Sequence, residues 1–364
     1  MKVLILSGVK WDSIWSHAHE LSRILSEEGY SVIFLDPPEV TTGTQPHLKI
    51  LSKRPRGNVK VIENKSVKKL GPAFLLIYEV TAIKTILKEN PDLIIFYGVL
   101  PGFATFSLAK LLRKKVIFMY VDDHRELLTN KIAKIFASIA IPIFIGWANG
   151  VISTAKVLHE ESMRNKRAFY IPNGINIRDF LHTKRIPRTV KNVYFIGTLG
   201  KWIRLEDFIT LADAGFNVFV IGHGEKFEEL KNATKNRRNI TLYGYLDRKA
   251  ALNEISEKCD IGIIPFLKNK LTDAISPIKL FEFVALNKPV LATNTIELES
   301  FKGIILVYST TDELKKNALF LKANPKLIKE IVKKNRKILK HYDWGSHLKK
   351  RILGAIRIIA GEEI

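Results

Sequence analysis

The residues best suited to chemistry lie in the segment 273–294, DAISPIKLFEFVALNKPVLATN. We expect a loop, then a short helix that begins at Ser276 and Pro277, then a turn and a buried strand. Serine is a preferred N-cap residue and proline suits the first helical position, so the first N–H groups of this helix would be available to a ligand. The positive end of the helix dipole and the ammonium group of Lys279 favour a phosphate group there.

Glu282 follows about two turns after Ser276 on the same expected helix. A carboxylate in that place can accept hydrogen bonds from two neighbouring hydroxyl groups of a sugar. A phosphate site and a diol acceptor at this spacing predict a nucleoside diphosphate sugar as the ligand. The alternative is an ordinary βαβ unit with a capped helix.

The stretch SPIKLFEF-VALNKPVLATN resembles the donor-site signature of GT-B glycosyltransferases, whose common form is P-x-K-x-x-E-x-x-A-x-G-x-P-V. In that family the glutamate, here Glu282, usually holds the ribose hydroxyls. Many relatives carry a second glutamate eight residues upstream, where this chain has Ala274, with Asp273 next to it. This departure leaves retention and inversion of the sugar configuration both open; we expect inversion, and a UDP-sugar as donor.

The chain has 364 residues, which suits two domains, each large enough for its own core. Strands alternate with helices in both halves, which predicts an α/β protein with doubly wound parallel sheets. The resemblance implies two Rossmann-like domains that face a cleft, with a C-terminal helix that crosses back. The expected strands are residues 2–7, 31–35, 59–62, 92–96, 115–120, 151–153 and 168–171 in the first half, and 192–196, 217–221, 240–243, 260–265, 290–293 and 303–307 in the second.

The domain junction is expected at the turn cluster 171–176, IPNGIN. In the GT-B family I-P-N-G-I/V is the usual exit from the first domain. We expect an acceptor-binding domain over 1–175, a linker over 176–190, a nucleotide-sugar domain over 191–342, and a helix over 343–364 that packs on the first domain. A helix over 13–28, a polar loop over 41–58 and one basic helical stretch over 312–340 are further expectations.

The net charge is +22, from 58 basic and 36 acidic residues. Nucleic acid, an anionic membrane surface and phosphorylated substrates are the partners that such a charge suits. We exclude nucleic acid because the sequence contains no recognisable module that binds it. The single cysteine, Cys259, excludes an intramolecular disulfide framework and a cysteine-cluster zinc site, and fits a reducing cytoplasm.

The segment 132–152 is apolar enough to suggest a membrane span. Lys134, Pro142 and the Asn149–Gly150 pair interrupt it, so we expect a buried or interfacial helix that leads into a strand. No secretory signal is recognised at residue 1. We therefore expect a cytoplasmic protein, and peripheral association with the inner face of a membrane stays open.

Parallel sheets place ligands at the carboxyl ends of their strands. Four strand ends of the second half carry residues that we assign to the donor site, with glycines that let the backbone approach a phosphate or sugar. The GT-B resemblance implies that Lys201 is a candidate phosphate contact and that the backbone near Tyr243 is a candidate for base recognition. The alternative for each is an ordinary turn. These residues are Gly197, Thr198, Lys201, Gly222, Tyr243, Gly244 and Pro265.

Asp122 and Asp123 follow the strand 115–120. A carboxylate at a strand end can remove the proton of an acceptor hydroxyl, which predicts one of them as general base, with Asp12 as a second candidate. The alternative is an N-cap or surface role. Trp11 is a candidate stacking surface for the acceptor, and His17 is either an acceptor contact or a satisfied helix histidine.

The resemblance implies transfer without a metal or other cofactor, with the helix dipole and basic side chains stabilising the departing diphosphate. It also implies a glycan or a lipid-linked sugar as acceptor, in the synthesis of cell-surface polysaccharide or glycolipid. Two alternatives remain: a nucleotide-sugar epimerase on the same fold, and a degenerate transferase that binds a ligand without catalysis.

Overall fold

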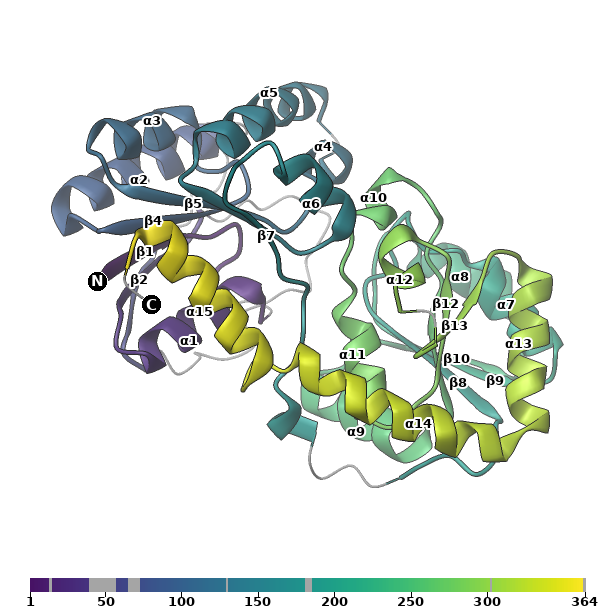
Figure 1. Cartoon of the computed structure of the whole chain (residues 1–364). Coiled ribbons are helices and arrows are strands. Elements are labelled where there is room, and N and C mark those ends of the chain that lie inside the picture. The colour runs from purple at the N-terminus through teal and green to yellow at the C-terminus, as the bar shows by residue number, and fades with distance from the viewer. Residues whose placement is uncertain are drawn as a thin grey trace. The chain divides into compact units, whose positions relative to one another are not determined.

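The computed structural model describes residues 1–12, 15–38, 57–64, 73–128, 130–180, 185–301 and 303–362. Most of the predicted polar loop over 41–58, the first two positions of the predicted helix over 13–28 and part of the predicted linker lie outside these residues. The chain divides into two compact units: unit 1 contains Met1–Pro172 and Lys349–Ile364, and unit 2 contains Asn173–Leu348 (Figure 1).

Unit 1 contains a seven-stranded parallel sheet in the order β3-β2-β1-β4-β5-β6-β7. Its central strands are short apolar runs that are buried along their length, as expected of strands covered on both faces. The strand order reverses between β1 and β4, so the carboxyl ends of these two strands form the switch point at which such sheets bind ligands. The strands are β1 (Lys2–Leu6), β2 (Ser31–Leu35), β3 (Val59–Ile62), β4 (Leu93–Tyr97), β5 (Lys115–Tyr120), β6 (Gly150–Ser153) and β7 (Ala168–Tyr170).

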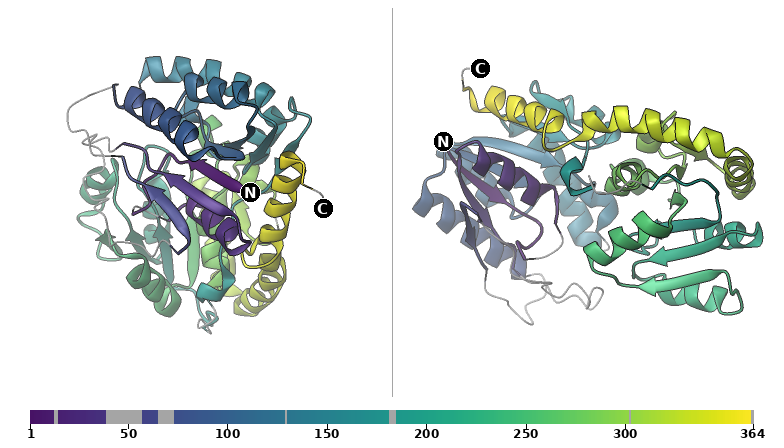
Figure 2. Two further views of the ribbon diagram at one scale, coloured as in Figure 1. Left: turned by 90° about the vertical axis from the view of Figure 1, so that its left-hand side faces the viewer. Right: turned by 90° about the horizontal axis from the view of Figure 1, so that it is seen from below.

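Helices cover both faces of this sheet (Figures 1 and 2). On one face α3 packs on α5, where the rings of Phe106 and Phe144 stack with 4.2 Å between their centroids. The C-terminal helix α15 returns to unit 1, as predicted: Ile359 lies against Gly150 of β6, and Lys349 Nζ is 2.8 Å from Glu28 Oε1, just after α1. The helices are α1 (His17–Glu27), α2 (Ala73–Glu89), α3 (Phe103–Leu111), α4 (His124–Leu127), α5 (Lys131–Trp147), α6 (Lys156–Ser162) and α15 (His347–Ala360).

The apolar segment 132–152 forms the helix α5 and then the strand β6, as predicted. No helix in the described part of the chain is long and apolar enough to cross a membrane. The short helix α4 was not predicted, because four residues carry too little periodicity to be recognised.

Unit 2 contains a six-stranded parallel sheet in the order β10-β9-β8-β11-β12-β13. Its switch point lies between β8 and β11. Gly262 in β11 is required by close packing, because a Cβ atom there would lie 2.5 Å from the ring of Phe283. The strands are β8 (Asn192–Ile196), β9 (Asn217–Ile221), β10 (Ile240–Gly244), β11 (Ile261–Ile264), β12 (Val290–Thr293) and β13 (Leu306–Tyr308).

The predicted basic stretch over 312–340 is two helices rather than one. The break lies at Asn324, because Pro325 has no N–H to continue the first helix and instead begins the second. The helices of unit 2 are α7 (Glu206–Asp213), α8 (Phe227–Thr234), α9 (Arg248–Lys258), α10 (Lys270–Asp273), α11 (Ile278–Ala285), α12 (Ile296–Glu299), α13 (Thr311–Ala323) and α14 (Pro325–Leu339), with 3-10 turns η1 (Ile177–Phe180) and η2 (Lys340–Tyr342).

Candidate functional site

Glu282 is a buried carboxylate held between two cations. It lies on α11, and its side chain is only 2% exposed. Lys279 Nζ lies 2.8 Å from Oε2, and Arg248 Nη1 donates to Oε1. The two cations are 37% and 53% exposed, so the charged groups open toward solvent on the cationic side. Each carboxylate oxygen can accept a further hydrogen bond, which is what a vicinal diol requires.

The charges around Glu282 keep it ionised. Burial alone would raise the pKa of its carboxyl group, but the charges and hydrogen bonds of Lys279 and Arg248 outweigh that effect, so its pKa lies below the ordinary value of 4.5. Glu282 is therefore an anion at neutral pH and acts only as a hydrogen-bond acceptor.

Arg248 was not recognised from the sequence. It is the first residue of α9, immediately after Asp247, which caps that helix through hydrogen bonds from Lys249 N and Ala250 N. Arg248 and Glu282 are 34 residues apart in the chain. The one available signal was a basic residue at the start of α9, just after the loop that follows β10, because the end of β10 was already assigned to the site.

The start of α11 differs from the prediction. Pro277, rather than Ser276, occupies the N-cap position, and it makes no side-chain cap. The Ser276 hydroxyl oxygen instead accepts the N–H of Asn173 at 3.1 Å, and the Ser276 carbonyl accepts Asn173 Nδ2–H at 2.8 Å. Asn173 belongs to the IPNG segment, so this motif fixes the loop that carries Ser276 and Pro277 in place.

The glycines that follow β8 and β9 and the glycine that ends β10 pack backbone to backbone at one edge of the unit 2 sheet. Gly197 N–H donates to the Ile221 carbonyl at 3.0 Å, and Gly222 N–H donates to the Gly244 carbonyl at 2.7 Å. A Cβ atom on Gly222, whose φ is +141°, would lie 1.8 Å from the Gly197 carbonyl oxygen. The structure therefore brings these three predicted glycines together, and no larger residue fits at Gly222.

The other predicted donor-site residues differ in what they present to a ligand. Thr198 and Lys201 are exposed in the loop after β8. The Tyr243 hydroxyl donates to Glu254 of α9, so its side chain is engaged away from the loop edge and only its backbone stays a candidate. Pro265 is buried at the end of β11, and its carbonyl accepts the N–H of Arg204 at 2.8 Å.

The position at which many GT-B relatives carry a second glutamate is buried in this chain. Ala274 is 2% exposed. The neighbouring Asp273 accepts the N–H of Ile296 at 2.8 Å through its Oδ1 atom and fixes the start of α12. Asp273 is thus engaged in structure at the place where such a carboxylate would be expected.

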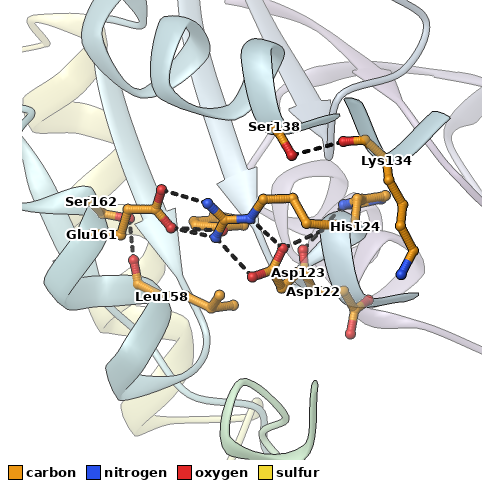
Figure 3. Close-up of polar contacts among 10 residues, drawn as sticks. Asp122, Asp123, His124, Lys134, Ser138, Leu158, Glu161 and Ser162 are labelled. Carbon is orange, nitrogen blue, oxygen red and sulfur yellow. Dashed lines mark hydrogen bonds and ion pairs between the residues drawn. The ribbon is translucent and has the colours of Figure 1, made fainter. Parts of the chain in front are cut away.

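In unit 1 the two adjacent aspartates after β5 have different environments (Figure 3). Asp123 caps α4 by accepting the Arg125 N–H at 3.0 Å, and both of its carboxylate oxygens accept from the Arg125 guanidinium group at 2.8 Å. The same guanidinium group binds Glu161 of α6 at 2.7 Å and the Tyr120 hydroxyl at 2.8 Å. Asp122 is exposed.

This difference corrects the prediction for Asp123 and narrows the choice of base. The Asp123 carboxylate accepts three hydrogen bonds from Arg125, so it caps α4 and holds the segment together. Asp122 is the remaining candidate of the pair. Arg125, which makes these contacts, was not recognised from the sequence, because its partner Glu161 lies 36 residues away.

The loop with Asp122 is fixed next to the end of β4. His124 Nδ1 lies 3.1 Å from the Asp122 carbonyl oxygen. The imidazole ring of His124 lies over Gly98, where a Cβ atom would come within 2.3 Å of it. Gly98 has a φ of +81°, so the position favours glycine for two reasons. The end of β4 and the loop after β5 are therefore close together.

Trp11 lies in the core, which corrects its prediction as a stacking surface. It is 2% exposed and packs against Phe34, with 5.0 Å between ring centroids, and against His19. No face of the ring is open to a sugar. Asp12 lies in the turn that follows, at the end of β1.

His17 joins the first turn of α1 to β4 at the switch point. Its Nδ1 atom lies 2.9 Å from the Tyr97 hydroxyl oxygen. Burial lowers the pKa of His17 to about 4, so its ring is neutral at neutral pH. A neutral imidazole can form a hydrogen bond with a hydroxyl group of the sugar acceptor. It carries no charge with which to bind an anion.

Known proteins are similar to this chain in part of its sequence and in its fold. Residues 190–333, which include Glu282, match the family model described as glycosyl transferases group 1. The second half of the chain is thus similar to group 1 glycosyl transferases, and the whole chain has the GT-B fold. No curated protein matches the sequence at a significant level.

The fold is similar to solved structures over almost the whole chain. Sucrose-phosphate synthase from Thermosynechococcus elongatus has a TM-score of 0.75 at 14% identity and covers 99% of both chains. Anabaena HepE in complex with UDP-glucose has a TM-score of 0.71 at 14% identity, with 98% of this chain and all of that chain covered. A structure described as trehalose-6-phosphate from E. coli, bound with UDP-2-fluoro glucose, has a TM-score of 0.69 at 12% identity and 99% coverage of both chains.

Proposed function

We propose that this protein is a glycosyltransferase that moves a sugar from a UDP-sugar to a hydroxyl group of a glycan or a lipid-linked sugar. The buried Glu282 carboxylate, flanked by Lys279 and Arg248, is the observation that carries the proposal, because it offers a diol acceptor beside cations that suit a diphosphate. The complexes of Anabaena HepE with UDP-glucose and of the E. coli protein with UDP-2-fluoro glucose support the choice of uridine.

In this proposal the chemistry is an inverting displacement. The Asp122 carboxylate takes the proton of the acceptor hydroxyl, whose oxygen forms a bond to the anomeric carbon of the donor sugar. The bond from that carbon to the diphosphate oxygen breaks, and UDP leaves with the electron pair. Lys279 and Lys201 stabilise the charge of the departing diphosphate, so that no metal ion is required.

Calorimetric titration with UDP, GDP and ADP tests the donor part of the proposal. We expect micromolar binding of UDP, weaker binding of the other two, and the same affinity with and without EDTA. Failure of all three to bind to the folded protein would overturn the donor site. Loss of binding in EDTA would overturn metal independence, and turnover of a UDP-sugar without any acceptor would favour an epimerase.

Replacing Lys279 by alanine should weaken the binding of UDP more than the binding of uridine. The lost charge-assisted hydrogen bond contributes about 1.5–3 kcal/mol, so we expect UDP affinity to fall about tenfold to a hundredfold. Uridine lacks the phosphates and should lose much less. Lys270→Ala, which removes an exposed lysine from the neighbouring helix α10, is the matched control and should leave both affinities unchanged. An equal loss for UDP and uridine would contradict the phosphate role of Lys279.

A further inference from the structure

The helix α5 has an apolar outer face. Ile132, Ile135, Ile139 and Trp147 are 78%, 61%, 54% and 60% exposed. Their spacing places them on one side of the helix, and we call these four side chains the α5 outer face. A surface helix of a globular protein normally turns polar residues outward and apolar residues inward. In α5 both sides are apolar, since the opposite side is buried in unit 1 through Ala137, Ala140, Ile141, Phe144 and Ile145.

Apolar exposure continues on the neighbouring helix. α3 packs against α5 through Phe103 and Phe106, and at its carboxyl end Leu111 and Leu112 are 79% and 42% exposed. Single exposed apolar residues are common, but an accumulation of them on adjacent helices marks an interaction surface.

The exposed charged side chains described on α2, on α5 and directly after α3 have one sign. Lys84 and Lys88 of α2, Arg113 after α3 and Lys131 of α5 are exposed. Among the described side chains of α2, α3 and α5 there is no exposed acidic residue. The two glutamates of α2 are only partly exposed and are engaged: Glu79 accepts the N–H of Thr105, and Glu89 pairs with Lys60.

We propose that the α5 outer face inserts into the interfacial region of an anionic membrane, while the exposed lysine and arginine side chains contact its headgroups. An apolar helix face with flanking cations is the arrangement of interfacial helices that lie on a membrane. Tryptophan is enriched at the membrane–water interface, and Trp147 lies at the end of α5. A second copy of the chain suits this face less, because it would bring the same positive charge, and the whole chain carries +22.

Co-sedimentation of the full-length chain with vesicles tests the proposal. We expect binding to vesicles of phosphatidylcholine mixed with phosphatidylglycerol, and much weaker binding to phosphatidylcholine alone. High salt should weaken binding without abolishing it, because the apolar contribution is not screened. Brominated phospholipids should quench tryptophan fluorescence of the wild-type protein, and less so that of Trp147→Phe, which locates the helix without relying on loss of binding.

Substitutions on the exposed side of α5 should leave the fold intact. The double variant Ile135→Glu with Ile139→Glu, and its neutral counterpart Ile135→Ser with Ile139→Ser, should each lower vesicle affinity by about tenfold or more. The matched control is Leu319→Glu with Phe320→Glu on α13, where the two residues are 39% and 50% exposed. It adds the same negative charge outside the α5 outer face, and should lower affinity much less.

Three results would overturn the proposal. The first is no vesicle binding by the folded wild-type protein. The second is binding that high salt removes completely and that the serine variant leaves unchanged, since charge alone would then account for it. The third is concentration-dependent self-association of the wild type that the serine variant abolishes, without vesicle binding, which would identify a second copy as the occupant.

Discussion

Replacing Glu282 by alanine is expected to abolish measurable binding of a nucleoside diphosphate and, with it, sugar transfer. Hydrogen bonds to a charged group contribute about 1.5–3 kcal/mol each, so the loss of two bonds to a ribose diol corresponds to about a hundredfold or more in affinity. Lys279 and Arg248 would also lose the carboxylate that orients them. The measurement is calorimetric titration with UDP, followed by the rate of transfer.

The variant Glu282→Gln separates the effect of the side-chain charge on affinity from the effect of the side-chain shape. Glutamine keeps the side-chain volume but offers one acceptor oxygen, so we expect an intermediate loss of affinity. Since the pKa of Glu282 is lowered by its cationic neighbours, this carboxylate stays ionised, and the wild-type affinity for uridine, which has no phosphate to protonate, should stay constant from neutral to mildly acidic pH. Unchanged affinity of a folded Glu282→Ala protein would remove the basis of the proposed donor site.

The second large effect is expected at Asp122. Asp122→Asn removes the proposed base, and general base catalysis contributes about a hundredfold to ten-thousandfold, so kcat should fall by that factor. The affinity for UDP should not change, because the proposed donor residues all lie in unit 2. The measurement is steady-state transfer together with UDP titration of the same preparation.

Asp123→Asn is the natural comparison, since it makes the same chemical change at the next residue. Asp123 caps α4 and pairs with Arg125, so its loss should mainly lower the melting temperature. The turnover of the protein that remains folded should change little. If Asp122→Asn keeps its activity while Asp123→Asn loses it, the assignment of the base to Asp122 is wrong.

The sheets were predictable because their strands are short, continuous apolar runs between turn residues. Ser31–Leu35, Val59–Ile62 and Lys115–Tyr120 were predicted to the residue. The helix ends were less predictable. The start of α11 depends on the hydrogen bond that the Ser276 hydroxyl oxygen accepts, and its donor is Asn173, 103 residues away.

The candidate site was predictable where it depends on local backbone geometry, as in the glycine loops, and where a spacing on one helix suffices, as for Lys279 and Glu282. It was not predictable where the deciding contact joins distant segments. Arg248 and Arg125 bind carboxylates 34 and 36 residues away. Trp11 was misjudged for the same reason: its burial depends on Phe34 in the next strand, which a local pattern does not reveal.

The return of α15 to unit 1 has a consequence for biosynthesis. A ribosome releases residues in order, so the complete segment of unit 2, Asn173–Leu348, emerges before the helix that completes unit 1. Until then β6 lacks the cover that Ile359 provides, and Glu28 lacks its partner Lys349. The usual order, in which the N-terminal domain finishes folding first, is therefore reversed at the last step. A nascent chain that stops before residue 349 contains a whole unit 2 and an unfinished unit 1.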